Sequence, residues 1–225
     1  VAAGTGWAAV ATSNNFLRIF SSTGLQDGIV WLDGTVVCMI GHKDKLFVIY
    51  HGGLPVDGVQ TLDFRYFRVD SGIRHCQAEG RVPLSTVEGC VLQWLGFTDR
   101  NMPVIMDSMG MVSVLAQQPG GWQWVPILDT GVLKKSEQDR YWPVACRGDR
   151  LLAVKLKGED VFPETHPRPV TTGESALIRM LFLPLESCCI SSMFFLWFSL
   201  GTEDPVRCPQ QGPGAPEAGA RPCLE

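Results

Sequence analysis

The stretch that most resembles a chemical motif lies at residues 4–9, which read GTGWAA. These letters fit G-x-G-x-x-A, the glycine pattern that places a dinucleotide pyrophosphate on a helix N-terminus directly after a strand. Here the preceding strand has at most three residues, Trp7 would crowd the phosphate, and a hairpin signal follows where the helix should begin. We therefore expect a glycine turn that opens a strand, and no bound cofactor.

A hydrolytic site can be imagined from one histidine, one aspartate and one serine, namely His51, Asp107 and Ser108. Asp107 and Ser108, however, open the stretch Asp-Ser-Met-Gly, which is ordinary turn sequence. The chain also lacks the patterns G-x-x-x-x-G-K-[ST], G-x-S-x-G and H-E-x-x-H, typical of phosphate-binding loops, serine hydrolases and zinc proteases. We expect a turn here and no catalytic residue, so the chain is predicted not to be an enzyme.

The possible metal ligands are scattered along the chain. The histidines fall in a turn, at a strand end, within a strand and between prolines, and no Cys-x-x-Cys pair occurs. A metal site would have to be assembled by tertiary folding alone, and none is expected. The histidines are His42, His51, His75 and His166.

The cysteines indicate a reducing intracellular compartment. Cys38, Cys90 and Cys146 lie in apolar, strand-like runs, where a free cysteine acts as a small hydrophobic residue. Cys188 and Cys189 are adjacent, which suits neither a metal knuckle nor an ordinary disulfide. The chain begins with valine and shows no basic region followed by an apolar core, so no signal peptide is expected and the sequence is interpreted as a fragment.

Several tryptophans could in principle form a base-stacking surface for nucleic acid. They stand among Leu, Val and Ile without interleaved Lys or Arg, so packing explains them better. The net charge of −4 provides no sequence-wide basic field, although a local basic patch could still form. The adjacent pair Lys134 and Lys135 shares its segment with Glu137 and Asp139, which is typical of a solvated loop. The tryptophans considered are Trp94, Trp122, Trp124 and Trp142.

The elements that would position these residues are short β-strands separated by turns. Apolar, β-favouring runs alternate with Gly, Asn, Asp and Pro, and no stretch shows the sustained periodicity of an amphipathic helix. The run at residues 46–50 is apolar throughout, as in a strand buried on both faces. The predicted strands are 7–12, 16–20, 29–32, 36–40, 46–50, 91–97, 104–106, 111–115, 122–128, 142–146 and 151–156.

The spacing of these strands favours a β-propeller. Val36, Val91 and Trp142 each begin a similar group of strands, so the groups recur about every 50 residues, which is the period of a four-stranded blade. A β-sandwich has similar strands but no reason to repeat at this interval. We predict an all-β fold of consecutive antiparallel four-stranded blades, in which Trp94 and Trp142 are largely buried.

The C-terminal part differs in composition. Prolines interrupt the chain after residue 161, and residues 176–183 are predicted to form one further strand. Residues 188–200 carry no charge but are too few for a membrane helix, which needs about 20 residues. Residues 201–225 are rich in Pro, Gly and Ala and are expected to be disordered. The predicted organisation is a partial propeller at 1–187, a short apolar segment at 188–200 and a disordered tail at 201–225.

Taken together, several stretches resemble the WD-repeat and HMG-box DNA-binding protein family, also known as acidic nucleoplasmic DNA-binding proteins or chromosome transmission fidelity adaptors of the replisome. The resemblance covers roughly residues 4–185, and each piece is weak by itself while their order is specific. The stretches are GTGWAA at 4–9, TSNNFLRIF at 12–20, GHKDKLFVIYH at 41–51, WLGF at 94–97 and DSMG at 107–110, followed by residues 122–126, 141–142 and 162–163.

The resemblance implies a fold, a location and partners. In that family this region is a six-bladed SepB-type propeller that follows WD repeats, precedes a helical bundle and holds the protein in a homotrimer. The bundle recruits DNA polymerase alpha and the GINS part of the replicative helicase. The resemblance thus implies a non-enzymatic scaffold in the nucleus that links helicase and polymerase, associates with chromatin or DNA, and has no membrane contact. The alternative is a generic propeller interaction module outside replication, with an enzyme a distant third.

The sequence also departs from the family pattern. It holds only about three and a half blades, and after Glu186 it reads as an apolar run and a tail where the family continues toward its helical bundle. We interpret this end as a splice variant, translated intron or faulty gene model, so the client-binding surface should be absent and no binding residue can be assigned. A partial ring is expected to expose blade faces and to aggregate. Residues suggested to line those faces are Leu46, Val48, Val112 and Val114.

Overall fold

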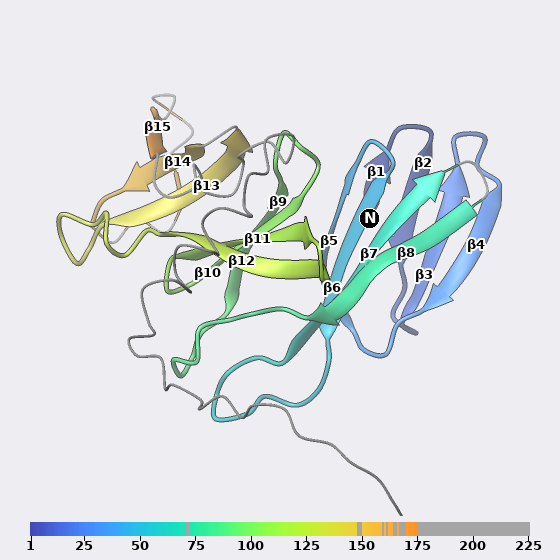
Figure 1. The fold of residues 1–225 in the computed structure, drawn as a ribbon, viewed down its shortest axis with the longest axis horizontal. Helices are drawn as coiled ribbons and strands as arrows, with labels where there is room; N and C mark the ends of the chain where they lie inside the picture. Colours follow the sequence, from blue (N-terminus) through green and yellow to red (C-terminus); the bar gives the residue numbers. More distant parts are fainter. Residues whose placement is uncertain are drawn as a thin grey trace, which may run out of the picture. The chain divides into compact units, whose positions relative to one another are not determined.

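The structure, a computed structural model, describes residues 1–70, 73–147, 150–158, 160, 162–163, 166 and 170–174. Within these ranges every helix or strand assigned is a β-strand, and the strands form separate antiparallel sheets that follow one another along the chain (Figure 1). No helix in these ranges has the length and apolar character needed to span a bilayer. The predicted strand at 176–183, the apolar segment at 188–200 and the tail at 201–225 lie outside the described residues.

Each sheet is a meander in which sequential strands are hydrogen-bonded neighbours. The first sheet contains β1 (Ala2–Gly4), β2 (Trp7–Ala11), β3 (Phe16–Ser21) and β4 (Gln26–Trp31). The second contains β5 (Val36–His42), β6 (Lys45–His51), β7 (Leu62–Asp70) and β8 (Ile73–Arg81). The third contains β9 (Leu92–Phe97), β10 (Pro103–Asp107), β11 (Met111–Gln118) and β12 (Gly121–Asp129). The described part of the fourth contains β13 (Arg140–Arg147), β14 (Arg150–Leu156) and β15 (Thr171–Glu174).

The first strands of consecutive sheets lie next to one another. β1 packs beside β5, β5 beside β9, and β9 beside β13. Thr98 and Cys146 form a parallel bridge at the ends of β9 and β13, so these two strands run in the same direction. Sheets that share an inner row of first strands and extend outward through their second to fourth strands are the blades of a propeller. The predicted fold class, an open propeller of antiparallel four-stranded blades, is therefore confirmed.

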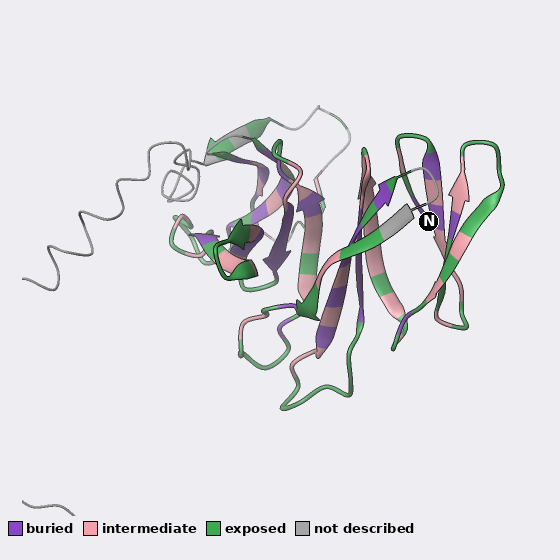
Figure 2. Cartoon of the chain, turned by 45° about the vertical axis from the view of Figure 1, so that its right-hand side comes forward, coloured by how far each residue is buried: buried purple, intermediate pink, exposed green. Residues whose placement is uncertain are grey.

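The hydrophobic core consists of clusters between neighbouring sheets. β6 contributes to two of them because its side chains alternate between faces. Leu46 and Val48 pack against the first sheet, whereas Phe47 and Ile49 pack toward the third. The uninterrupted apolar run that predicted a strand buried on both faces is thus confirmed. In Figure 2 the buried residues gather on strands that face a neighbouring sheet, whereas β4 has a mostly exposed to intermediate pattern.

The residues predicted to line exposed blade faces are in fact buried inside the chain. Leu46 and Val48 lie between the first and second sheets, and Val112 and Val114 lie between the third and fourth. The prediction was wrong because the sequence shows which strands are apolar but not which neighbour covers each face. The exposed apolar face belongs instead to the first sheet, as described below.

Two further features bear on the predictions, namely the burial of two tryptophans and a strand that was missed. Trp94 and Trp142 are of intermediate burial: Trp94 packs at the margin of the cluster between the third and fourth sheets, and the ring of Trp142 meets Phe162 edge-on at 5.5 Å between centroids. β15 was not predicted, because Thr171–Glu174 has no apolar run to mark it. Its pairing with β14, from Leu151 opposite Glu174 to Val154 opposite Thr171, provides the signal that the sequence lacks.

Candidate interaction surfaces

The GTGWAA motif forms a tight hairpin. β1 ends at Gly4 and β2 begins at Trp7, with Gly4 directly opposite Trp7 in the ladder. Gly6 has a φ of 81°, a left-handed conformation that glycine adopts without strain. A strand follows the motif, so the glycine turn predicted from the sequence is confirmed and the geometry required for a pyrophosphate site, a helix N-terminus, is not formed by these residues.

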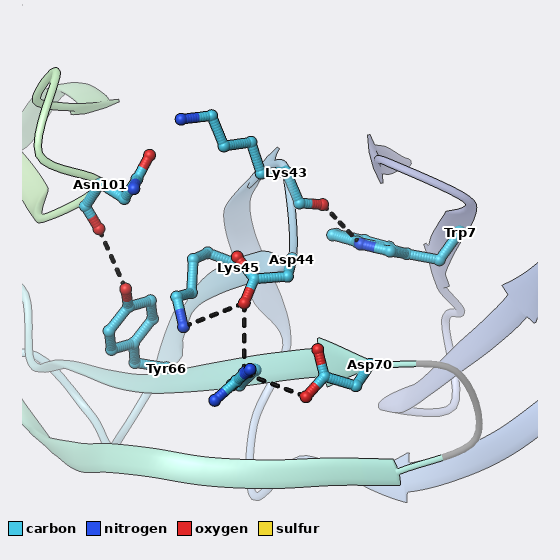
Figure 3. Close-up of polar contacts among 8 residues, drawn as sticks. Trp7, Lys43, Asp44, Lys45, Tyr66, Asp70 and Asn101 are labelled. Carbon is cyan, nitrogen blue, oxygen red and sulfur yellow. Dashed lines mark hydrogen bonds and ion pairs between the residues drawn. The ribbon is translucent and has the colours of Figure 1, made fainter.

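The same motif joins the first sheet to the second. The Trp7 indole nitrogen donates a hydrogen bond to the backbone oxygen of Lys43 at 2.8 Å (Figure 3). The Thr5 amide donates to the same oxygen at 2.7 Å. A side chain on Gly4 would collide with the same oxygen, and one on Gly41 would collide with the Ala3 carbonyl. The two backbones therefore approach more closely than any other residue type allows, and the buried Trp7 ring closes the contact.

The β5–β6 turn carries a small network of charges beside this contact. Asp44 forms ion pairs with Lys45 at 3.3 Å and with Arg68 at 3.2 Å, and Arg68 also pairs with Asp70 at 3.0 Å. Desolvation raises the pKa of Asp44, but the hydrogen bond and charge of Lys45 and the charge of Arg68 outweigh it, so the pKa lies below its usual range. Lys43 has a φ of 52°, and its side chain points away from the network (Figure 3).

A single hydroxyl links the second sheet to the third at the same end of the strands. The Tyr66 hydroxyl donates to the backbone oxygen of Asn101 at 3.0 Å (Figure 3). Burial raises the pKa of Tyr66 far above its usual range, so the phenol stays protonated and remains a donor. Motifs that resembled cofactor or family signatures thus serve to fasten one sheet to the next.

The hydrolase candidates do not assemble. His51 ends β6 in the second sheet, whereas Asp107 and Ser108 follow β10 in the third. The Asp107 carboxylate accepts hydrogen bonds from the hydroxyl and amide of Ser85 and from the amide of Met111. The Ser108 hydroxyl accepts the amide of Val91 at 3.1 Å. Both side chains hold a turn and the loop beside it, as the turn interpretation predicted.

The scattered histidines and cysteines also stay apart. Among the described residues no three His, Cys, Asp or Glu side chains are grouped closely enough to hold a metal ion. His42 lies beside the Phe97 ring, with centroids 5.8 Å apart. Desolvation raises the pKa of Cys38 and of Cys146 to about 11, so both thiols are neutral packing groups rather than reactive thiolates.

The tryptophans of β12 take part in packing between the second and third sheets. The Trp122 ring meets Tyr66 edge-on at 5.3 Å, and the Trp124 ring meets Phe64 edge-on at 5.4 Å. Edge-to-face pairs at these separations stabilise a core beyond their buried area. The interpretation of these residues as packing rather than base-stacking groups agrees with this geometry.

The first sheet presents an apolar face that the sequence did not reveal. On β3, Leu17 and Ile19 turn inward, whereas Phe16 and Arg18 turn outward opposite Trp31 and Ile29 of β4. Trp31 is 69% exposed and Ile29 is 47% exposed. We call this surface the open face; it consists of Val10, Phe16, Arg18, Ile29 and Trp31. Alternation along β3 alone could have predicted that one side is exposed.

The loop before the fourth sheet is fastened by a buried carboxylate. Asp139 accepts hydrogen bonds from the amides of Lys135 and Ser136 and pairs with the Lys155 ammonium at 2.6 Å. The hydrogen bond from Lys155 lowers the pKa of Asp139, desolvation opposes this, and the two amides lower it further, so the pKa lies below its usual range. This carboxylate was assigned to a solvated loop from sequence; that assignment is wrong for Asp139, while Lys134 and Glu137 are exposed as expected.

Comparisons with known proteins bear on what these surfaces serve. A family model described as "Minichromosome loss protein, Mcl1, middle region" matches residues 1–175. The chain is 38% identical over 189 residues to "Protein ENHANCER OF LHP1 1" of Arabidopsis thaliana, covering 83% of this chain and 19% of that protein. It is 36% identical over 191 residues to "WD repeat and HMG-box DNA-binding protein 1" of Homo sapiens, covering 84% and 16%. It is 31% identical over 170 residues to "Minichromosome loss protein 1" of Schizosaccharomyces pombe, covering 72% and 20%.

The chain therefore spans no more than about a fifth of these relatives. Among solved structures, the WD40 domain of SCAP from fission yeast shares 9% of its residues with the aligned part of the chain. That alignment has a TM-score of 0.28 and covers 67% of this chain and 48% of that domain.

Proposed function

Because the chain belongs to the family of the minichromosome loss protein Mcl1 middle region, we propose that it is a propeller scaffold acting in DNA replication. The observation that carries this proposal is the match over residues 1–175, which includes the described strands of all four sheets. The names of the relatives associate that family with DNA binding and minichromosome loss. A nuclear location follows from the same association.

The finer part of the proposal concerns partners. The protein to which this chain corresponds links the replicative helicase, through GINS, to DNA polymerase alpha, and does so as a homotrimer associated with chromatin. The propeller supplies the rigid body of that assembly, and client peptides bind elsewhere. Supporting this division, the polar groups of Trp7, Lys43 and Tyr66 fasten sheets to one another and are therefore not available to a client.

The proposal assigns no catalysis to the chain. The side chains best suited to hydrolysis, Asp107 and Ser108, are engaged by amides and a hydroxyl of the neighbouring loops. The proposed organisation keeps the partial propeller at 1–187, the apolar segment at 188–200 and the tail at 201–225. In a longer protein of this family, a preceding blade would cover the open face, whose Phe16, Ile29 and Trp31 resemble the interior of a sheet-to-sheet contact.

A chimera tests the scaffold role. The segment of the human relative that aligns with this chain would be replaced by residues 1–175, and the chimera expressed in cells depleted of that relative. We expect the chimera to form a trimer, to co-purify with the helicase and polymerase alpha, and to restore replication. The matched control carries Gly41→Ala, which should disrupt the contact of β1 with β5 and abolish the rescue.

Two results would each contradict one part of this proposal. A chimera that is folded and trimeric but fails to restore replication would favour a generic propeller interaction module. Capture of a polymerase alpha peptide by the 225-residue chain alone would contradict the assignment of client binding to another part of the protein. We expect that chain alone to aggregate in solution and to capture no polymerase alpha peptide, as measured by light scattering and pull-down.

A further inference from the structure

A cavity of about 470 Å³ lies between the third and fourth sheets, at the end of the strands opposite the Trp7 and Lys43 contact. Its apolar lining comes from Met106 of β10 and Tyr141 of β13, both buried, and from the half-exposed Met109. The lining is mixed, because Gln93, Ser108 and Thr130 also border the cavity. Cavities of a few hundred cubic ångströms that combine apolar surface with placed polar groups are the usual form of ligand sites. This one has room for a large aliphatic side chain.

The rim of the cavity carries more positive than negative charge. Lys134 and Arg140 line it, as does one carboxylate, Glu137. No ion pair within the part of the chain that the structure describes involves any of these three. Asp139, the other nearby carboxylate, is paired with Lys155. Since the whole chain has a net charge of −4, this rim is a local exception that favours an anionic ligand.

The wall that carries the two cations is held in place before any ligand arrives. The amide and the hydroxyl of Thr130 each donate a hydrogen bond of 2.9 Å to the backbone oxygen of Gly110. The Tyr141 hydroxyl donates to the oxygen of Leu133 at 3.1 Å, and the Asp139 carboxylate accepts hydrogen bonds from the amides of Lys135 and Ser136. These contacts bracket Lys134 and directly precede Arg140. A pre-ordered wall lowers the entropy cost of binding.

The turn between β10 and β11, which forms another side of the cavity, is equally constrained. Asp107 and Ser108 fix the turn between β10 and β11 to the loop at residues 82–91. Gly110 has a φ of 98°, and a side chain there would collide with the Thr130 hydroxyl, so the turn and the wall fit closely together. The hydrogen bonds that exclude Asp107 and Ser108 from catalysis therefore build one side of this cavity.

From these features we infer that the cavity binds an acidic peptide segment of a partner protein, with one aliphatic side chain over Met106 and Tyr141 and flanking carboxylates facing Lys134 and Arg140. The apolar floor selects a side chain rather than a free inorganic anion. Glu137 partly offsets the positive charge of the rim, so the rim favours the well-separated carboxylates of a peptide over the more densely spaced phosphates of nucleic acid. This inference does not depend on a role in replication.

The test uses the full 225-residue chain displayed on yeast, where association between copies cannot interfere. The probe is a fluorescein-labelled peptide in which one leucine is flanked on each side by three glutamates. We expect saturable binding that a peptide with glutamines in place of the glutamates does not show. The variant Lys134→Glu/Arg140→Glu should weaken binding at least about tenfold, since it reverses both charges that face the ligand.

Matched variants separate a site from general charge attraction. Lys135→Glu changes the adjacent exposed lysine, which does not line the cavity, and should alter affinity by less than about twofold. Glu137→Gln should tighten binding a few-fold by removing the one unfavourable charge. The reversed variant should instead bind a peptide whose leucine is flanked by lysines, which shows that it is still folded.

Several outcomes would overturn the inference. Equal binding of the glutamate and glutamine peptides would remove the role of charge, and an equal loss from Lys135→Glu would show non-specific attraction. A peptide with serine in place of leucine that binds as tightly would exclude the apolar floor. Tighter binding of oligodeoxythymidine than of the acidic peptide, with loss in the reversed variant, would assign the site to nucleic acid instead.

Discussion

The contact between the first and second sheets differs in kind from the contact between the third and fourth. The first is filled: glycine backbones meet at Gly4 and Gly41, and the Trp7 ring covers them. The second has a buried apolar cluster at its centre and a cavity at one end, beside the loop that the ion pair of Asp139 with Lys155 fastens to β14. Both join the same kinds of strands in the same order.

The difference shows how contacts between similar blades can have different roles, one joining sheets and another also bordering a cavity. A filled contact of glycine and tryptophan tolerates no ligand and no larger side chain, so it can only hold sheets together. A contact that is packed at its centre and has hydrogen-bonded turns and loops at one end keeps its rigidity while a cavity stays open at that end. The sequence motif at residues 4–9 therefore marks a place where binding is excluded, whereas the loop at residues 130–139, which carries no motif, frames the site.

Trp7→Ala should produce the largest loss of stability. It removes a buried ring, a hydrogen bond to Lys43 and the cover over two glycines, and substitutions of this kind cost about 3–5 kcal/mol. The matched control is Trp31→Ala on the open face, expected to cost less than about 0.5 kcal/mol. The urea concentration at which the yeast-displayed chain loses its resistance to protease, in a format where copies cannot associate, measures both. Similar losses for the two would show that the filled contact has no special role.

Gly41→Ala should have the next largest effect. The added carbon would meet the Ala3 carbonyl of β1, so one strand must shift, at a cost of about 1–3 kcal/mol in unfolding free energy. Gly53→Ala is the control, because the nearest neighbour of its added carbon is the Thr61 methyl group at 3.7 Å. If Gly41→Ala unfolds at the same urea concentration as the parent chain, then β1 and β5 are not as closely apposed as described.

Asp139→Asn should have the smallest effect, and one that depends on pH. The folded-state pKa of Asp139 is lowered, so its stabilisation is present above the unfolded value of about 3.9 and is lost as pH falls through the folded value. The variant should therefore melt below the parent chain at neutral pH, and the gap should close under acid conditions below about pH 4.

The control for this pH dependence is Asp57→Asn in the exposed loop after β6, where no ion pair is formed among the described residues. Its melting temperature should follow that of the parent chain at every pH. A gap between Asp139→Asn and the parent that is constant from neutral to acid pH would mean that the lost contact is not the charged pair with Lys155.

The sequence contained enough to predict most of the strands and their recurrence, although the predicted strands did not include β1 or β7. Turn residues such as Ser13 and Asn15 and the groups beginning near Val36, Val91 and Trp142 set the meander, because turn chemistry and alternation are local properties. It did not predict β15, whose strand character depends on its neighbour β14. Nor could it say which sheet covers Val112 or Leu46, since that depends on how one sheet stacks on the next.

For the functional surfaces, the sequence mainly argued against candidate cofactor and hydrolytic sites. It correctly identified the turns at Gly6 and Asp107, but it did not show that these turns fasten the sheets and build one side of a cavity. The roles of Lys134 and Arg140 arise because Asp139 binds Lys155 across the sequence, which no local pattern records. The open face likewise required knowledge of the register between β3 and β4.

The order of the strands separates the connections of this molecule into two groups. In each antiparallel meander the turn from the first to the second strand lies at one end, while the turn from the second to the third and the link to the next sheet lie at the other. The contacts of Trp7, Lys43 and Tyr66 occupy the first end; the longer segments at 52–61, 82–91 and 130–139 occupy the second. Lineages can therefore lengthen, shorten or recharge the second group and acquire new recognition without altering the fastenings that keep the blades in register.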